Sequence, residues 1–441
     1  MNGSIKRPAR RITHEVVIVG GGVAGIHLAT KLGRETRSMP EISIKLVDAA
    51  LTHVWKPSLH EFAAGSRGIG DDEVGFLSHS VRNNYQFRLG RLAGVDTENQ
   101  EVALDPVTDE AGKPIAPRRT LGYDTLVLAI GSVCSDLGIP GVTENCLFLD
   151  NRKQAQDLHR EFLNLALRYD SGALPDDSDS IDIAIVGGGA TGVELAAELR
   201  EATHSGIDTL IPPEKVRISV IEASDRLVPG LPERLSRAVR RELEKLDVNV
   251  LLDSRVTRVT RNSIILDDDR AVGAHLKIWA AGISAPDALR TLGQFEHDRI
   301  GRIKIGNTLQ AVGYDNIFVL GDSACCPWTG KDTPVPPRAQ AAIQQAAFMV
   351  GQIRRRLADQ PLLEFEYRDR GSLVSIADQS AVGSLMGKTL GVITFEGRLA
   401  RWAYLSLYQM HLLSIFGVAK TVYLCLANFF AARTRPRLKL H

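Results

Sequence analysis

Cysteine is scarce in this sequence, and the few cysteines present follow no recognisable pattern. The 441 residues include five cysteines, which have neither the spacing of a metal site nor that of a disulfide framework. This scarcity fits a protein kept in a reducing compartment. No Ser-His-Asp or metal-ligand constellation is visible either, and we predict no metal. The formal net charge is only +1, so the composition gives no overall attraction to nucleic acid.

A secretory signal is also missing. The N-terminus is basic, but the apolar stretch after it is interrupted at once by Gly20, and no cleavage-site pattern follows. We therefore expect the protein to be made and kept in the cytoplasm. The length of the chain predicts two or three domains, and a hydrophobic content of 44% is ordinary for a folded globular protein.

What the sequence does contain is one motif in two copies. Residues 16–32 (VVIVGGGVAGIHLATKL) and 183–199 (IAIVGGGATGVELAAEL) are identical at nine of seventeen positions. Each copy is a β-branched run, a G-x-G-x-x-G turn and an apolar helical pattern. In a dinucleotide site the first glycine permits the turn, the second admits a pyrophosphate, and the third lets helix and strand pack closely. The glycines are Gly20, Gly22 and Gly25 in the first copy and Gly187, Gly189 and Gly192 in the second.

Each copy leads to an acidic residue at the end of another apolar run, Asp48 in the first and Glu222 in the second. A carboxylate at that position can accept a hydrogen bond from a ribose 2′-OH. Two further runs, TLVLAIGS and HLKIWAAGISAP, share a strand-then-glycine form and contain Gly131 and Gly282. We predict two dinucleotide sites in one chain. Resident FAD would be bound through the first copy with Gly131, and a visiting nicotinamide through the second with Gly282.

The order of these motifs predicts an α/β fold with two Rossmann-type dinucleotide-binding domains. We expect the first part of the FAD-binding domain in residues 1–150 and an inserted NADH-binding domain in residues 151–283. The second part of the FAD-binding domain is expected in residues 284–395. Apolar runs near residues 372–395 are expected to be strands, with Gly383, Gly387 and Gly391 at turns.

The last forty residues change character. Residues 402–419 contain no Asp, Glu, Lys or Arg, and residues 421–432 are nearly apolar. The first stretch has the minimum length of a spanning helix, but Gln409, His411 and Ser414 interrupt it. We expect residues 396–441 to form amphipathic helices that lie in the interface of an anionic membrane, rather than a buried helix or a dimer contact. The chain ends on the basic residues Arg433, Arg435, Arg437 and Lys439.

Two residues outside the repeats are candidates for flavin contacts. Asp322 ends the buried run NIFVLGDSA, where its carboxylate can hydrogen-bond to the FAD ribitol, although a turn-forming aspartate is the alternative. Lys56 lies in HVWKPSLHEFAAG. A positive group near the flavin ring stabilises the reduced, anionic flavin, although a solvated lysine fits this sequence nearly as well.

Three polar side chains on expected helices are further candidates for catalysis. Gln340 and Gln344, in PPRAQAAIQQA, lie on one helical face, and their amides can serve a quinone in both redox states. Exposed glutamines are nevertheless common on helices. Glu194 stands in the second repeat where His27 stands in the first. It is either a carboxylate favoured by the helix N-terminus or a group that supplies a proton or orients the nicotinamide.

Taken together, these motifs resemble one family. The two glycine motifs, HVWKPSLHE, LAIGS, WAAGI, VLGDSA and PPRAQAAIQ occur in the order found in type II NADH:quinone oxidoreductases. The ending, with LYQMH and RPRLKLH, looks like that of the bacterial respiratory members. The resemblance covers nearly the whole chain, and the combination is specific although single pieces are not.

The resemblance implies FAD as cofactor, NADH as electron donor, a membrane quinone (ubiquinone or menaquinone) as acceptor, and no proton pumping. It implies a peripheral protein on the cytoplasmic face of the inner or plasma membrane, and it leaves a homodimer open. It also makes Gln340 and Gln344 quinone contacts and places Glu194 near the nicotinamide and the flavin. Many relatives carry histidine where this chain has Ile343, which puts a protonation role at that position in doubt.

Two other functions remain open on the sequence. A sulfide:quinone oxidoreductase shares the fold and the membrane tail, but it needs paired cysteines at the flavin. Here the only close pair is the vicinal Cys325–Cys326, and no C-x₄-C of a disulfide reductase follows the first repeat. A non-enzymatic redox sensor would bind flavin and NADH without turning over a quinone.

Overall fold

The computed structural model describes residues 13–431, apart from residues 40, 68–72, 110, 175–177, 206–209, 377–379, 388–390 and 397. The chain forms two compact units, each assembled from three segments. The first unit consists of Met1–His53, Glu73–Val133 and Ser284–Asp369. The second consists of Val54–Asp72, Cys134–Ile283 and Arg370–His441.

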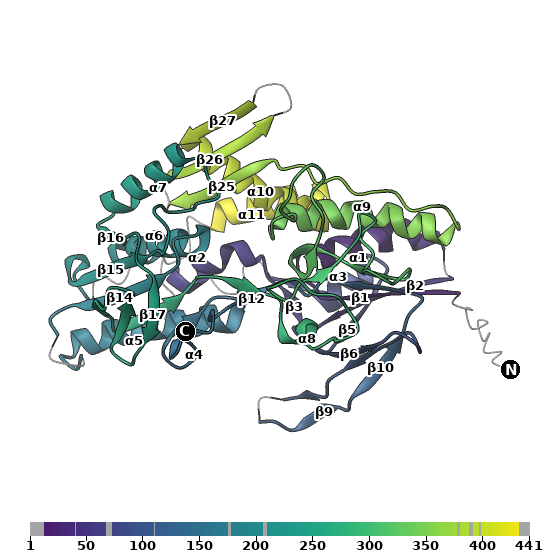
Figure 1. Ribbon diagram of the computed structural model, residues 1–441, viewed down its shortest axis with the longest axis horizontal. Helices are drawn as coiled ribbons and strands as arrows, with labels where there is room; N and C mark the ends of the chain where they lie inside the picture. Colours follow the sequence, from purple (N-terminus) through teal and green to yellow (C-terminus); the bar gives the residue numbers. More distant parts are fainter. Residues whose placement is uncertain are drawn as a thin grey trace. The chain divides into compact units, whose positions relative to one another are not determined.

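The first unit is built on a five-stranded parallel sheet (Figure 1). Its order is β23 (Ile317–Val319), β11 (Thr125–Leu128), β1 (His14–Val19), β2 (Ile42–Asp48) and β5 (Gln86–Leu89). The inner strands are runs of Val, Ile and Leu that are buried, as in parallel sheets covered on both faces. The chain supplies β23 only after it has completed the sheet of the second unit. This sheet is therefore assembled from segments far apart in the sequence.

Helices and short strands surround this first sheet. Helix α1 (Val23–Glu35) packs against α9 (Ala339–Leu357), and α3 (Phe76–Arg82) packs against β5. A three-stranded antiparallel sheet joins β10 (Arg119–Gly122), β7 (Glu101–Leu104) and β6 (Leu92–Asp96). The smaller elements of this unit are β3 (Thr52–His53) with β4 (Val74–Gly75), β8 (Val107–Thr108) with β9 (Pro114–Ala116), β22 (Ile303–Lys304) with β24 (Ala324–Cys325), α8 (Asp287–Arg290), and the 3₁₀ turns η1 (Thr36–Ser38) and η5 (Gly321–Ser323).

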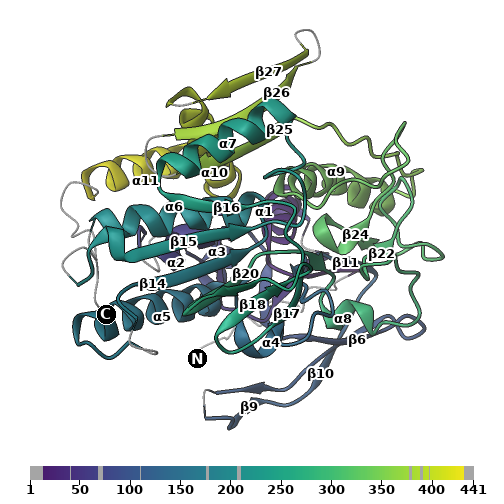
Figure 2. The same cartoon turned by 60° about the vertical axis from the view of Figure 1, so that its left-hand side comes forward.

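The second unit repeats the same plan with a second five-stranded parallel sheet (Figure 2). Its order is β13 (Leu147–Phe148), β20 (Leu276–Trp279), β14 (Ile181–Val186), β15 (Val216–Ile221) and β16 (Val248–Leu251). Helices α6 (Ala190–Ser205) and α7 (Glu233–Lys245) follow β14 and β15, while α5 (Arg152–Asp170) and α2 (Leu59–Ala64) pack together. Its smaller elements are β17 (Val256–Val259), β18 (Ser263–Leu266), β19 (Ala271–Gly273), α4 (Val142–Asn145), η2 (Lys56–Ser58) and η4 (Pro213–Lys215). The paired short strands β12 (Val133–Cys134) and β21 (Ile283–Ser284) each contain a point at which the chain passes from one unit to the other.

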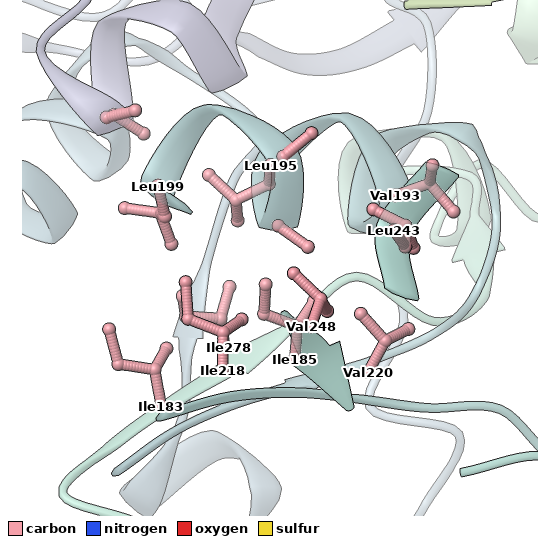
Figure 3. Close-up of a cluster of buried hydrophobic side chains, with 14 of the residues drawn as sticks. Ile183, Ile185, Val193, Leu195, Leu199, Ile218, Val220, Leu243, Val248 and Ile278 are labelled. Atoms are coloured by element: carbon pink, nitrogen blue, oxygen red, sulfur yellow. The ribbon is translucent and has the colours of Figure 1, made fainter. Parts of the chain in front are cut away.

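The core of the second unit follows from the two-residue period of its strands. On β14, Ile183 and Ile185 face α6, where they meet Val193, Leu195 and Leu199 (Figure 3). The alternate residues Ala184 and Val186 belong to the cluster on the opposite face. Full burial of each such aliphatic side chain contributes roughly 1.5–3 kcal/mol. The two hydrophobic faces fix the register of β14 and with it the position of the glycine turn that follows.

The C-terminal part of the second unit is a three-stranded antiparallel sheet followed by two helices. Strands β25 (Gly371–Ile376), β26 (Ser380–Gly387) and β27 (Gly391–Glu396) confirm the strands expected near residues 372–395. Gly387 and Gly391 form the last pair of the β26–β27 ladder, and residues 388–390 between them lie outside the described residues, whereas Gly383 lies inside β26. Helices α10 (Arg398–Phe416) and α11 (Val418–Ala431) follow. Among the described residues, no helix combines the length and the apolar character that crossing a membrane requires.

The compact units divide the chain at other points than the predicted domain boundaries. Residues 134–150 lie in the second unit because β13 pairs with β20 there. Residues 370–395 also lie in the second unit, because β25 packs against α6. The predicted boundaries followed the cofactor motifs, and short strands such as β13 carry no sequence signal of the sheet they join.

Candidate functional site

The first glycine turn joins β1 to α1. Gly20 has a φ of +106°, and a Cβ on it would lie 2.3 Å from the carbonyl oxygen of Ala129. A Cβ on Gly25 would lie 1.7 Å from the oxygen of Gly20. The protein itself therefore requires glycine at these two positions. A Cβ on Gly22 would meet no atom within 4 Å, so at the N-cap of α1 the chain leaves space open.

The second glycine turn, between β14 and α6, has the same geometry. Gly187 has a φ of +110°, and its Cβ would lie 2.7 Å from the backbone of Ala280. A Cβ on Gly192 would lie 2.0 Å from the oxygen of Gly187, whereas one on Gly189 would meet nothing within 4 Å. In both turns the second glycine alone faces open space. A bound pyrophosphate can approach the backbone and the helix N-terminus there.

The acidic residue of each repeat supports its turn. Asp48 accepts a hydrogen bond of 2.6 Å from the N–H of Gly21, and Glu222 accepts one of 2.6 Å from the N–H of Gly188. Their second oxygens accept from Ala50 and Ser224. A carboxylate has about four acceptor sites, so each can still receive a ribose hydroxyl. Burial raises the pKa of Asp48, and the N–H bonds from Ala50 and Gly21 oppose that shift.

The other residues predicted for FAD lie at neighbouring strand ends of the first sheet. The hydroxyl of Ser132, after β11, donates to Asp322, after β23, at 2.9 Å. The N–H of Gly131 donates to the hydroxyl of Ser323 at 2.8 Å. Since the carboxyl ends of parallel strands meet at one edge, Gly131 and Asp322 share the sheet edge of the first glycine turn. In the second sheet, Gly282 follows β20 with a φ of +70°, at the edge that carries the second turn.

Gln340 and Gln344 share one face of α9, as their spacing predicts, and both amides have partners within the first unit. The amide of Gln344 donates to the carbonyl of Arg368 at 2.8 Å and accepts from the N–H of Arg368 at 3.1 Å. The amide of Gln340 donates to Asp369 at 3.2 Å. The two side chains thus hold the segment that follows α9.

Sequence reasoning missed Gln345, the next residue on α9. Its side chain is buried, and its oxygen accepts a hydrogen bond of 2.6 Å from the N–H of Gly321. This bond ties α9 to the turn that carries Asp322. The pair Gln344–Gln345 was visible in the sequence, but the helical period could not say which glutamine points inward.

Lys56 lies in the second unit and makes an ion pair with Asp150, at 3.1 Å. Its side chain is 46% exposed. Asp150 also accepts the N–H of Cys134, so this carboxylate joins η2 to β12. The ion pair gives the lysine a local partner that the sequence did not reveal.

Glu194 is buried on α6, against α2 and β25. Its carboxyl accepts a hydrogen bond of 3.1 Å from the N–H of Ser375 and lies 3.5 Å from Nδ1 of His60. Burial, together with a smaller effect of the nearby Glu61 and Glu198, raises its pKa to about 8, although the bond from the N–H of Ser375 opposes this shift. Burial lowers the pKa of His60 to about 3, so the imidazole is neutral and offers no charge to Glu194. Glu194 is therefore a neutral acid at pH 7 and can donate a proton.

Comparison with known proteins connects this geometry to a family. A family model of pyridine nucleotide-disulphide oxidoreductases matches residues 14–346. A type II NADH:quinone oxidoreductase from Haemophilus influenzae is 38% identical over 446 residues, covering 97% of this chain and 99% of that protein. The chain belongs to the type II NADH:quinone oxidoreductase family. A further type II NADH:quinone oxidoreductase, from Mycobacterium tuberculosis, is 29% identical and covers 97% of this chain and 90% of its own length.

Solved structures extend the likeness of fold. NDH2 from Plasmodium falciparum in complex with NADH has a TM-score of 0.81 at 18% identity, covering 97% of this chain and 100% of that chain. The sulfide:quinone oxidoreductase from Aquifex aeolicus has a TM-score of 0.71 at 19% identity, covering 91% of each chain. At sequence identities this low, the likeness is evidence of a shared fold alone.

The cysteines of this type II NADH:quinone oxidoreductase family member are all free thiols. Burial raises the pKa of Cys325 and raises that of Cys326 to about 12. Burial beside Asp150 also raises the pKa of Cys134 to about 12. Such thiols stay protonated at neutral pH and are poor nucleophiles. Among the residues that the structure describes, no group of three or more His, Cys, Asp or Glu side chains could hold a metal ion.

Proposed function

We propose that the protein is an NADH:quinone oxidoreductase with resident FAD, which reduces a membrane quinone without pumping protons. The observation that carries the proposal is the 38% identity to the Haemophilus influenzae enzyme over 97% of the chain. The two glycine turns, each at the edge of its own parallel sheet, would supply the two dinucleotide sites that this activity needs. When bound, FAD would accept a hydride from NADH and give up two electrons to the quinone.

The first turn is our proposed FAD site. The backbone at Gly22 and the N-terminus of α1 would bind the pyrophosphate, and Asp48 would accept the adenosine ribose hydroxyl. Gly131 and Asp322 would lie along the ribitol. The bond between Gln345 and the N–H of Gly321 would hold the turn that carries Asp322. We keep Lys56 as a candidate flavin neighbour, although the ion pair with Asp150 reduces the positive charge it can offer.

The second turn is our proposed NADH site. Gly187, Gly189 and Gly192 would receive the pyrophosphate, with Gly282 at the neighbouring strand end. Glu222 would accept the ribose 2′-OH and would repel a 2′-phosphate, which favours NADH over NADPH. As a neutral acid, Glu194 would supply a proton or a hydrogen bond to the reacting groups.

The quinone site is proposed at Gln340 and Gln344 on α9. Their amides can donate to a quinone carbonyl and accept from a quinol hydroxyl. The amide of Gln344 uses one N–H and one lone pair of its oxygen on Arg368, so its second N–H and second lone pair can still bind a quinone. The amide of Gln340 donates to the carboxylate of Asp369 in the same segment.

The C-terminal helices are proposed to bind the membrane interface. Leu412 and Ile415 of α10 are buried, whereas the other face of the helix pair presents large apolar side chains to solvent. An exposed apolar stripe of this kind marks an interfacial helix, which would hold the protein peripherally on the cytoplasmic face. Trp402 lies outside the residues with described side chains, and Arg433, Arg435, Arg437 and Lys439 lie outside the described residues. The large apolar side chains that α10 and α11 expose are Leu407, Met410, Leu413, Val418, Val422, Tyr423 and Leu426.

The decisive experiment is a steady-state assay of NADH oxidation with and without a short-chain quinone, together with the absorbance spectrum of the purified protein. We expect bound FAD in a one-to-one ratio and NADH oxidation that depends on quinone. Flavin reduction by NADH without quinone turnover would instead identify a redox sensor.

A sulfide:quinone oxidoreductase is the second enzyme to test, because that fold is similar. Sulfide in place of NADH should reduce neither the flavin nor the quinone. The thiols of Cys325 and Cys326 are adjacent in the chain and have raised pKa values, which disfavours them as a nucleophilic pair. Reduction by sulfide at a rate comparable to that with NADH would refute this assignment.

A further inference from the structure

The middle glycine of each dinucleotide turn is held at both of its backbone polar groups. In the second turn, the N–H of Gly188 donates to Glu222 at 2.6 Å, and its carbonyl accepts from the backbone N–H of Val228 at 2.7 Å. In the first turn, the N–H of Gly21 donates to Asp48 at 2.6 Å. Its carbonyl is held by a side chain instead, the Nδ1 of His53 at 2.8 Å. The middle glycine is thus held in the same way in both turns. Its carbonyl is bound by a main-chain N–H in the second turn and by an imidazole in the first.

The tautomer of His53 follows from its partner. A carbonyl oxygen can only accept, so Nδ1 of His53 must carry the proton that it shares with Gly21. The imidazole is buried on β3, and burial lowers its pKa to about 4. The ring is therefore neutral at pH 7, with the proton on Nδ1.

Phe76 encloses the same glycine from another side. A Cβ on Gly21 would lie 2.3 Å from Cζ of Phe76, and the ring of Phe76 packs edge-on to His53 with a centroid distance of 6.5 Å. In the second turn Leu227 has this role, 2.6 Å from a Cβ on Gly188. The motif allows any residue between its first two glycines. In both turns here, a neighbouring side chain leaves no space for a Cβ at that position, so it is glycine.

The hydrogen bond from His53 also determines the direction of a second backbone group. The carbonyl of Gly21 and the N–H of Gly22 belong to one planar trans peptide, in which the two groups point in opposite directions. If the carbonyl is fixed toward His53, the N–H of Gly22 is fixed away from it. Gly22 is exposed and faces the open space at the start of α1.

We propose that His53 is a positioning residue of the FAD site, which aims the N–H of Gly22 at the FAD pyrophosphate by holding the carbonyl of Gly21. This inference rests on the proposed function, because it takes the first turn as the FAD site. His53 affects the affinity for FAD through its bond to Gly21, and this bond itself makes no contact with the cofactor. NADH affinity does not depend on a side chain at the corresponding point, because the N–H of Val228 holds the second turn.

The test compares substitutions of His53 in the full-length protein after removal of the flavin. His53→Leu removes the donor at similar bulk, whereas His53→Asn keeps an amide N–H where Nδ1 stood. His79→Leu is the matched control, because His79 is equally buried in the first unit and bonds to Tyr85 at 2.9 Å, away from the turn. Flavin fluorescence gives the Kd of FAD, and NADH fluorescence gives the Kd of NADH.

We expect His53→Leu to raise the Kd of FAD at least about tenfold, or about 1.4 kcal/mol, and to leave the Kd of NADH unchanged. His53→Asn should restore most of the affinity for FAD, and His79→Leu should resemble the natural protein. An unchanged Kd in His53→Leu, or an equal loss in His79→Leu, would overturn the inference. If His53→Leu does not fold, His53→Asn is compared with His53→Gln, whose amide lies one bond too far out. Equal affinities of these two variants would then refute it. A natural protein that binds no FAD would refute the proposed function instead.

Discussion

Replacing Glu194 by glutamine should stabilise the protein, and more strongly as the pH rises. Glu194 is only 7% exposed, and burial raises the pKa of its carboxyl from the usual 4.5 to about 8. In the unfolded chain the same group ionises near its usual pKa. Between these two values, folding must therefore take up a proton, and each rise in pH disfavours the folded state. The cost is absent below pH 4.5 and complete above pH 8.

The size of the effect follows from the same two pKa values. Each unit of pKa difference corresponds to roughly 1.4 kcal/mol. At pH 6 the cost of keeping Glu194 protonated is about 2 kcal/mol, and at pH 9 the full shift of about 3.5 units costs about 5 kcal/mol. Glutamine keeps the shape and carries no charge at any pH. The stability advantage of Glu194→Gln should thus grow by about 3 kcal/mol between pH 6 and pH 9.

The measurement is urea unfolding of the flavin-loaded protein and of the variant at both pH values, followed by tryptophan fluorescence. Glu201→Gln is the matched control, because Glu201 is on the same helix but is only partly buried. Buried histidines such as His27 and His53 also titrate, but they are common to both proteins and cancel in the difference. An advantage of Glu194→Gln that stays constant from pH 6 to pH 9 would refute the conclusion that Glu194 is neutral in the folded protein.

Four further predictions test the proposed sites. Gly22→Ala should fold but bind FAD more weakly, whereas Gly25→Ala should not fold, since its Cβ would lie 1.7 Å from the oxygen of Gly20; circular dichroism and flavin content distinguish the two. The ratio of kcat/KM for NADH to that for NADPH should be at least about ten, and Glu222→Ala should lower it; a ratio near one in the natural protein would contradict the role of Glu222. Gln340→Leu should slow quinone reduction and leave stoichiometric flavin reduction by NADH near normal, and a fall in both rates would make the residue structural. Removal of residues 399–441 should abolish binding to anionic liposomes in a flotation assay and spare flavin reduction, and full binding after truncation would exclude these helices as the anchor.

The sequence was sufficient for the glycine turns because their constraints are local. A positive φ at Gly20 and the close contact of Gly25 with the same turn involve residues within one motif, and the pattern of β-branched strand and apolar helix surrounds them. The sheet edges could be predicted as well, because the carboxyl ends of parallel strands coincide. Gly131 and Asp322 therefore lie at neighbouring strand ends. The hydrogen bond between Ser132, next to Gly131, and Asp322 joins residues that are 190 positions apart in the sequence.

The partners of individual polar side chains could not be predicted, because they come from segments without a pattern of their own. Lys56 finds Asp150, which is 94 residues away, and His53 finds Gly21 through the short strand β3. Glu194 is buried against β25, and the N–H that it binds there, that of Ser375, is 181 residues further along the chain. Burial of this kind decides the charge of a carboxyl, and the helical period of α6 says nothing about it.

The spacing of the glutamines of α9 predicts their shared face but not the partners of their amides. The spacing of Gln340 and Gln344 predicts a shared face, and both side chains do bond to the same segment, at residues 368 and 369. The amide of Gln344 already has a donor and an acceptor bond there, each worth about 1 kcal/mol net. Its second N–H and second lone pair remain for a quinone carbonyl or a quinol hydroxyl, so contact with a quinone does not require the loss of the bonds to Arg368. Replacing either glutamine by leucine removes its bond to this segment together with the proposed quinone contact, so separate measurement of the two half-reactions is what distinguishes quinone binding from support of the fold.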